Sequence, residues 1–392
     1  MYYWECENSI RPPLIVIAGP TGVGKTAASV RLAKEINGEI VSADSMQIYK
    51  YMDIGTAKVT KEEMEGVPHH LIDILEPDED YDVTRFKEMA KEAVSGILKR
   101  GRVPIVCGGT GFYIQALLYD IDFTEEGDRE ASERIRERYY KEAEELGRRA
   151  VHERLLKIDP LSYERIPANN LKRVVRALEF YELHGEPISA HNDREKEKRS
   201  RSPYDYRLFA LTDDRQRLYD RIDRRVDLMM ERGLLNEVRE LRKMGIRRDA
   251  TSMQAIGYRE LLRYLDETEQ GADTSAEEWR RAGTGLTEPK PMNISETKKL
   301  DTAAFCGTEP HGRAASEDSF RNSIVDGIVD EDELLKKAVD DIKKNSRHYA
   351  KRQLTWLRRE PEVIEINISE TGDIADEFKK HLYGNGDIPG GI

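Results

Sequence analysis

Cysteine is scarce in this chain, and long apolar runs and a basic leader are missing. Cys6, Cys107 and Cys306 have neither metal-ligand spacing nor the even number of a disulfide framework. Such usage is typical of a reduced, cytoplasmic setting. The start, MYYWECENSIRPP, lacks the basic and apolar parts of a signal peptide, and apolar runs such as residues 14–18 are too short to span a membrane. Secreted, membrane-spanning and collagen-like classes are therefore excluded.

The apolar fraction is low, and acidic residues exceed basic ones. Hydrophobic residues make up 38% and charged residues 35% of the 392 positions, so part of the chain is expected to be charged helix or unstructured. The 75 acids and 63 bases give a formal net charge of −12, which argues against a uniformly basic nucleic-acid-binding protein. A local basic patch is still compatible with this negative net charge. The length fits two or three domains.

Segments typical of buried strands alternate with segments of helical spacing. The strand-like segments are residues 14–18, 39–43, 103–107 and 206–212, with shorter ones at 69–74 and 363–368. The helical segments are residues 26–36, 85–98, 111–119, 215–244 and 331–356. This alternation predicts an α/β fold with a parallel sheet covered by helices.

A glycine-rich turn between the first strand and the first helix fits the phosphate-binding pattern G-x-x-x-x-G-K-[ST]. Its glycines let backbone amides converge on phosphate oxygens, the lysine adds a positive charge, and the threonine hydroxyl can bind Mg²⁺ at the start of a helix that favours anions. The residues are Gly19, Pro20, Thr21, Gly22, Val23, Gly24, Lys25 and Thr26. We predict a diphosphate- or nucleotide-binding loop, with Thr26 as the metal ligand.

The composition along the chain divides it into five segments. We predict a P-loop catalytic core in residues 1–123 and 203–267, and an all-helical insertion in residues 124–202, where strand signals are few. Residues 268–330 are rich in Gly, Ser, Thr and Pro without an apolar period, so we expect a mobile, exposed, low-complexity insertion there; a small ordered subdomain is the alternative. Residues 331–392 are expected to form a basic helix and the last strand of the core.

Polar residues follow two of the predicted strands, at the sheet edge where ligands bind in open α/β folds. Asp44 could act there as a general base, or could simply cap a turn. Thr110 could contact a phosphate or a nucleophile, or could cap a helix. The strand at residues 103–107 ends without the aspartate that organises Mg²⁺ in most kinases and ATPases, which weakens an ATP-hydrolysis role. His69 and His70 lack metal-ligand spacing, and we expect a structural role.

Two basic groups of residues point to phosphate. Arg221 and Arg225 share one helix face, where they could clamp a diphosphate or form salt bridges with Asp220 and Asp223. Residues 343–359 hold seven Lys and Arg, no acid, and two interleaved aromatics, Tyr349 and Trp356. This pattern is typical of a nucleic-acid contact, and aromatics among cations suit unstacked RNA bases. Ordinary solvation of the helix is the alternative.

Taken together and in this order, the motifs resemble those of the tRNA dimethylallyltransferases, also called tRNA isopentenyltransferases. The resemblance is of the bacterial type and covers nearly all of residues 13–267 and 331–360. The motifs are GPTGVGKT, VSADSMQIYKYMDIGTAK, PHHLIDI, GGTGFY, DPLSYERIPANNLKRVVRALEFYELHGEPIS, SMQAIGYRE and YAKRQLTWLR.

The resemblance implies a fold, a P-loop NTPase (kinase-like) core with an inserted all-helical tRNA-binding domain, and a function. Such an enzyme transfers a dimethylallyl group from dimethylallyl diphosphate to the exocyclic amine of the tRNA adenine just 3′ of the anticodon, with Mg²⁺, in the cytoplasm; we expect a monomer. It implies that Asp44 is the general base, that Thr110 lies near the leaving group, that Arg225 binds diphosphate, and that the helical insertion grips the anticodon stem-loop. The implied tRNA-contacting residues are Asp44, Ser45, Met46, Gln47, Lys172, Arg173, Val174, Val175, Arg176, Gln254, Ala255, Ile256, Gly257, Tyr258, Arg259, Lys351, Arg352, Gln353, Trp356 and Arg358.

Two other functions compete with this one. The first is a small-molecule kinase, or an isopentenyltransferase acting on free adenine nucleotides; neither needs a basic helix or a helical insertion. The second is a non-catalytic RNA-binding protein, against which the joint presence of Lys25, Thr26, Asp44, Thr110 and Arg225 argues. The chain departs from the family at residues 269–330, which intervene where its members run on almost directly. We expect no zinc-finger extension of the kind found in eukaryotic members.

Overall fold

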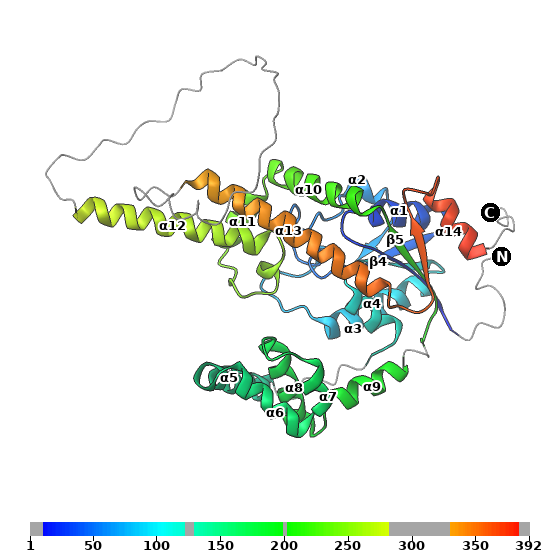
Figure 1. Cartoon of the computed structure of the whole chain (residues 1–392). Helices are drawn as coiled ribbons and strands as arrows, with labels where there is room; N and C mark the ends of the chain where they lie inside the picture. The colour runs from blue at the N-terminus through cyan, green and yellow to red at the C-terminus, as the bar shows by residue number, and fades with distance from the viewer. Residues whose placement is uncertain (1–10, 122–128, 199–201, 282–329, 384–392) are drawn as a thin grey trace, which may run out of the picture. The chain divides into compact units, whose positions relative to one another are not determined.

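The computed structural model describes residues 11–121, 129–198, 202–281 and 330–383. Its first compact unit, residues 1–258 and 342–392, is built on one six-stranded sheet of order β3-β2-β4-β1-β5-β6, in which all neighbours are parallel. The predicted α/β class is therefore confirmed (Figure 1). The strands are β1 Pro13–Ala18, β2 Gly38–Ala43, β3 His69–His70, β4 Val103–Gly108, β5 Asp205–Thr212 and β6 Val363–Asn367.

Helices cover both faces of this sheet. On one face, α1, α10 and α14 pack on Ile15, Ile17 and Phe209. On the other, α3 contacts β2 and β4, and Phe86 of α3 stacks on Tyr113 of α4. Burial on both faces explains why the strands are unbroken apolar runs. The helices are α1 Lys25–Glu35, α2 Lys61–Met64, α3 Val83–Lys99, α4 Gly111–Leu118, α10 Arg215–Glu231, α11 Leu234–Lys243, the 3₁₀ turn η1 Ser252–Gln254, α13 Glu331–Leu357 and α14 Ile374–Tyr383.

Two predicted elements are shorter in the structure. The helix predicted over residues 215–244 is broken at Gly233, whose φ of 97° ends α10 and lets α11 start in a new direction. The strand predicted over 69–74 is only two residues long, because Leu71 and Asp73 have positive φ angles that leave the extended region. The histidines are structural, as expected: His69 Nδ1 contacts the Val67 carbonyl oxygen and His70 Nε2 contacts Glu39.

Between α4 and β5 the chain forms a layer of helices with its own hydrophobic core. Val151, Leu155, Val174 and Leu178 are fully buried in it. The buried carboxylate of Asp159 accepts hydrogen bonds from backbone amides and hydroxyls at the starts of two helices, and thereby joins them. The helices are α5 Arg129–Leu146, α6 Arg148–Ile158, α7 Pro160–Arg165, α8 Leu171–His184 and α9 Ile188–Lys198.

The second compact unit, residues 259–341, contains nearly all of α12 Tyr258–Arg281 and the start of α13. Helix α12 extends through residues 269–281, the first part of the predicted insertion, where the sequence did not predict a helix. These residues are rich in Ala, Glu and Arg, so they form helix without the apolar period on which the prediction relied. Residues 282–329, the remainder of the predicted insertion, lie outside the described residues. No helix in the described ranges has an apolar stretch long enough for a membrane span.

Candidate active site

The predicted phosphate-binding loop joins β1 to α1. Gly22 and Gly24 have φ angles of 79° and 94°, which other residues rarely adopt, so the loop needs glycine at both turns. Helix α1 begins at Lys25, and the first amides of a helix have no partner within it. The loop and the start of α1 therefore have the geometry in which backbone amides can bind an anion.

The Lys25 side chain is folded back over this loop. Its Nζ donates hydrogen bonds to the carbonyl oxygens of Gly19 (3.0 Å) and Pro20 (2.9 Å). Burial lowers the pKa of Lys25 to about 8, against the opposing influence of Cys107 and Asp44. A bound anion therefore stabilises the charged form of Lys25 more than it would stabilise that of a well-solvated surface lysine.

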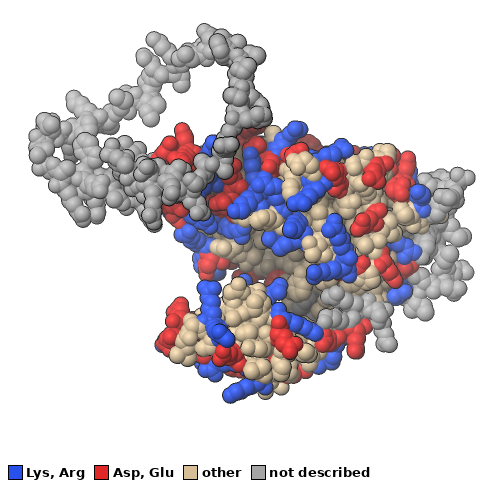
Figure 2. Space-filling model, viewed as in Figure 1, with Lys and Arg blue, Asp and Glu red and all other residues tan. Residues whose placement is uncertain are grey.

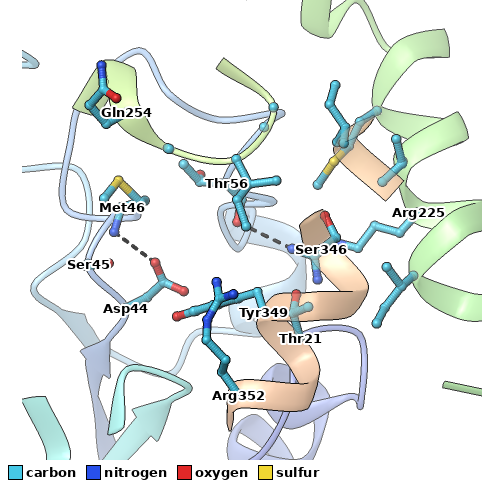
Figure 3. Close-up of a pocket in the computed structure, with 18 residues that line it drawn as sticks. Thr21, Asp44, Ser45, Met46, Thr56, Arg225, Gln254, Ser346, Tyr349 and Arg352 are labelled. Atoms are coloured by element: carbon cyan, nitrogen blue, oxygen red, sulfur yellow. Dashed lines mark hydrogen bonds between the residues drawn. The ribbon is translucent and has the colours of Figure 1, made fainter. Parts of the chain in front are cut away.

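Asp44 follows β2 and uses one carboxylate oxygen for local structure. Its Oδ1 accepts hydrogen bonds from the backbone amides of Met46 (2.9 Å) and Gln47 (3.3 Å). Figure 3 shows the carboxylate facing a cavity, with the Tyr349 hydroxyl and the Arg352 guanidinium directed toward it. Asp44 can therefore both cap the turn and act as a general base, because only one of its carboxylate oxygens is used by the turn and the carboxylate faces the cavity.

Thr110 precedes α4, but its side chain does not cap that helix. Its hydroxyl is buried against the phenol of Tyr349, and its backbone amide donates to the Ala43 carbonyl oxygen (3.3 Å). Burial and the charge of Asp44 raise the pKa of Tyr349 to about 12. Tyr349 therefore stays protonated and can donate a hydrogen bond inside the cavity. The sequence indicated this residue only as an aromatic among cations.

Helix α10 contributes two arginines with different surroundings. Burial lowers the pKa of Arg225 despite the attraction of Asp44, and its Nη2 donates to the Thr56 carbonyl oxygen (3.5 Å). Arg221 lines the same region but is paired with the buried carboxylate of Asp213. The alternative pairing, of Arg221 with Asp220 or Asp223, is not what the structure has.

These side chains meet where two cavities adjoin. The phosphate-side cavity, about 370 Å³, is lined by Lys25, Thr26, Ser42, Arg221 and Arg224 among others. The apolar-walled cavity, about 270 Å³, is lined by Met46, Ile222, Val226, Met229 and Ile342 among others (Figure 3). Both include Thr21, Asp44, Arg225 and Tyr349. An anion and an apolar group on one ligand could therefore be held side by side, next to a carboxylate.

The structural role of Glu237 was not predicted from the sequence. This carboxylate, on α11, accepts hydrogen bonds from the amides of Asp53, Ile54 and Gly55 (2.8–3.0 Å) and from the Tyr258 hydroxyl (2.6 Å). It thereby joins two segments that flank the apolar-walled cavity, residues 53–56 and 254–258. The three amide donors lie more than 180 residues from Glu237 in the sequence. No short motif could therefore have revealed this link.

Comparisons with known proteins identify the family of this chain. The family model for IPP transferase matches residues 47–285 and 320–360, and that for isopentenyl transferase matches residues 12–75. The tRNA dimethylallyltransferases of Lachnoclostridium phytofermentans and Bacillus cytotoxicus are 43% and 42% identical, over 90% and 96% of this chain and 90% and 97% of their own lengths. The chain belongs to the tRNA dimethylallyltransferase family. It is therefore an enzyme, a transferase.

A solved structure is similar over most of the chain. The full-length tRNA isopentenylpyrophosphate transferase of Bacillus halodurans is 36% identical, with a TM-score of 0.58, covering 95% of this chain and 96% of its own. The solved relatives of this chain have a P-loop core. The P-loop core that the sequence predicted is therefore confirmed.

Several residues that were expected to contact tRNA are buried in this enzyme. Val174 and Val175 lie in the core of the helical layer, while Lys172, Arg173 and Arg176 of α8 are exposed. Tyr258 is fully buried, Ala255 nearly so, and Gln254 is exposed. Ser45, Met46, Gln254, Ile256 and Gly257 line the apolar-walled cavity, Gln47 lines the phosphate-side one, and Arg259 begins the second unit.

Helix α13 has fewer free charges than its sequence indicates. Arg347 pairs with Asp223 and Lys343 pairs with Asp227, both on α10. Lys351, Arg352 and Arg358 are exposed, and the Arg352 guanidinium lies 5.6 Å from the Tyr349 ring centroid. Lys and Arg side chains gather over the face formed by α10 and α13 (Figure 2). Gln353 is buried, and Trp356 packs on Gly111.

Proposed function

We propose that this enzyme transfers a dimethylallyl group from dimethylallyl diphosphate to the N6 amine of the adenine 3′ of the tRNA anticodon, position 37. The products are N6-(dimethylallyl)adenosine and diphosphate. The observation that carries the proposal is the pair of adjoining cavities that share Asp44, Thr21, Arg225 and Tyr349. An anion-binding loop on one side and an apolar wall on the other fit a prenyl diphosphate, and the carboxylate lies between them.

On the donor side, the loop amides, Lys25 and Arg225 bind the diphosphate and stabilise the negative charge that grows on it as the allylic C–O bond breaks. Tyr349 borders the same space, whereas Thr110 lines neither cavity and lies behind Tyr349, with its hydroxyl buried against the phenol. Mg²⁺ fits Thr26, which is exposed and lines the phosphate-side cavity. Diphosphate oxygens would complete the ligands of the ion, since the described residues contain no group of three His, Cys, Asp or Glu placed to hold a metal ion. The ion would neutralise part of the leaving group's charge.

On the acceptor side, the adenine amine attacks the allylic carbon, so that an N–C bond forms as the C–O bond breaks. The nitrogen loses a proton, which Asp44 accepts. An adenine inside a tRNA loop reaches such a cavity only when it is flipped out of its stack. The exposed cations of α8 and α13 are the proposed phosphate contacts, with the helical layer gripping the anticodon stem-loop.

A label-transfer assay tests the reaction. The protein is mixed with Mg²⁺, labelled dimethylallyl diphosphate and unmodified tRNA, with AMP and ATP as parallel acceptors. Label should enter the tRNA, and should not enter tRNA in which the adenine at position 37 is replaced. Label only in AMP or ATP would assign the enzyme to free nucleotides, and ATP consumption without transfer would favour a kinase.

The basic face of α13 makes a prediction about salt. Replacing Lys351 and Arg352 together with Ala should weaken tRNA binding and reduce the slope of log K against log salt by about 1.4–1.8, because two phosphate contacts are lost. Filter binding between 50 and 200 mM salt measures the slope. The matched control is Lys343→Ala, which removes a lysine already paired with Asp227. An unchanged slope in the double variant would contradict phosphate contact by this helix.

The low pKa of Lys25 makes a prediction about pH. In the free enzyme this lysine loses its proton as pH rises through about 8, whereas bound diphosphate favours the charged form. Affinity for dimethylallyl diphosphate should therefore fall above pH 8, and binding at pH 9 should take up a proton. Calorimetry without tRNA, in buffers of different ionisation enthalpy, measures this uptake. Lys25→Met should bind weakly and take up none; a pH-independent affinity from 7 to 9.5 in the native enzyme would refute the role of the lysine.

A further inference from the structure

The side chain of Gln353 joins helix α13 to the two turns that carry the donor site. Its Oε1 accepts a hydrogen bond from the Thr21 amide (2.9 Å), and its Nε2 donates to the Gly109 carbonyl oxygen (2.9 Å). The side chain is nearly fully buried, at 5% exposure. Both polar ends of the carboxamide are therefore used inside the protein.

The turn before α4 is shaped to receive this helix. A Cβ atom at Gly109 would lie 2.0 Å from Gln353 Nε2, and one at Gly111 would lie 2.3 Å from the Trp356 ring. Glycine at these two positions thus allows α13 to approach the backbone closely. Gly108, next to Gly109, and Thr21 both line the phosphate-side cavity, so the helix is fastened to both sides of it.

The Thr21 amide lies within the phosphate-binding loop, between β1 and α1. The hydrogen bond to Gln353 fixes the orientation of that peptide group. The neighbouring amides of the loop converge on an anion only when the loop has a single, defined conformation. A preorganised loop binds its anion without first having to order itself. Gln353 provides this restraint from 332 residues away.

We propose that Gln353 is a positioning residue for diphosphate rather than a contact for tRNA. The neighbouring Lys351 is exposed and lines neither cavity, whereas Gln353 is buried and faces the loop. This inference rests on the proposed function, because it assigns Gln353 to the handling of one of the two substrates.

The test separates the two substrates. Gln353→Met keeps the length of the side chain but removes both hydrogen bonds. It should raise KM for dimethylallyl diphosphate about tenfold, the effect of losing about one net hydrogen bond, and leave the Kd for tRNA unchanged. Lys351→Met is the matched control, with the opposite result: a raised Kd for tRNA and an unchanged KM for dimethylallyl diphosphate. If Gln353→Met does not fold, Gln353→Asn is used instead, whose side chain is one methylene shorter. It should raise KM for dimethylallyl diphosphate by less than tenfold.

A second readout does not depend on the transfer reaction. Binding of inorganic diphosphate with Mg²⁺, measured by calorimetry without tRNA, should weaken about tenfold in Gln353→Met and stay unchanged in Lys351→Met. Native enzyme that transfers no label to tRNA would refute the proposed function, whatever the variants do. Native transfer activity with an unchanged diphosphate affinity in Gln353→Met, or with a Kd for tRNA raised as much as in Lys351→Met, would overturn the positioning role.

Discussion

Asp44→Asn is expected to lower the rate of dimethylallyl transfer by about 10²–10⁴-fold, the usual contribution of a general base, and to leave tRNA binding intact. Asparagine retains a side-chain oxygen that can accept from the amides of Met46 and Gln47, so the turn after β2 should persist. What the variant loses is the ability to accept the amine proton. Single-turnover rates with saturating tRNA and dimethylallyl diphosphate measure the effect.

Asp82→Asn is the matched control for this change. Asp82 caps α3 through the same kind of bond, from the Arg85 amide to Oδ1 (2.9 Å), and lines neither cavity. It should transfer dimethylallyl at close to the native rate. Should Asp44→Asn remain within tenfold of native while folded, proton removal by Asp44 is not part of the mechanism.

Arg225→Met should lower kcat/KM for dimethylallyl diphosphate by about 10²–10³-fold. Its guanidinium is desolvated at the junction of the two cavities, and in such a place a donor aimed at developing negative charge has that order of effect. Methionine keeps much of the apolar contact of the long side chain. Initial rates at saturating tRNA with varied dimethylallyl diphosphate give the ratio, and tRNA affinity should change little.

Arg232→Met provides the comparison for Arg225→Met. Arg232 is exposed at the end of α10 and lines neither cavity, so its loss should change kcat/KM by less than threefold. Equal losses in the two variants would mean that the effect comes from the stability of α10. If Arg225→Met lowers kcat/KM only slightly, Arg225 does not bind the diphosphate, and the loop, Lys25 and Arg221 are sufficient for that role.

The sheet and the loop were predictable because their signals are local. A buried strand such as β1 is a continuous apolar run, and the phosphate loop is a contiguous set of residues whose glycines its geometry requires. The break at Gly233 was missed because the apolar residues on either side continued to fall at spacings close to helical ones. The helix through residues 269–281 was missed for the opposite reason: it has helix-forming residues but no apolar period.

Residues buried within a motif were the least predictable part of the site. The resemblance implied tRNA contacts for whole motifs, and a motif lists neighbours in sequence whether they face solvent or the interior. Val174 and Val175 turn inward while Lys172 and Arg176 turn outward, because successive positions of a helix point in different directions. The charge of α13 was overestimated likewise, since Arg347 and Lys343 pair with acids of another helix.

By itself the sequence determined the fold class, the phosphate loop, the candidate roles of Asp44, Thr110 and Arg225, and the family. These depend on residues close together in the chain or on an ordered set of motifs. Only the tertiary structure decided which side chains share a cavity and which fasten its walls. Tyr349 reaches Thr110, Glu237 holds residues 53–55, and Gln353 bonds Thr21. Such links join elements far apart in sequence, and a hydrogen bond between them leaves no periodicity or spacing in either segment.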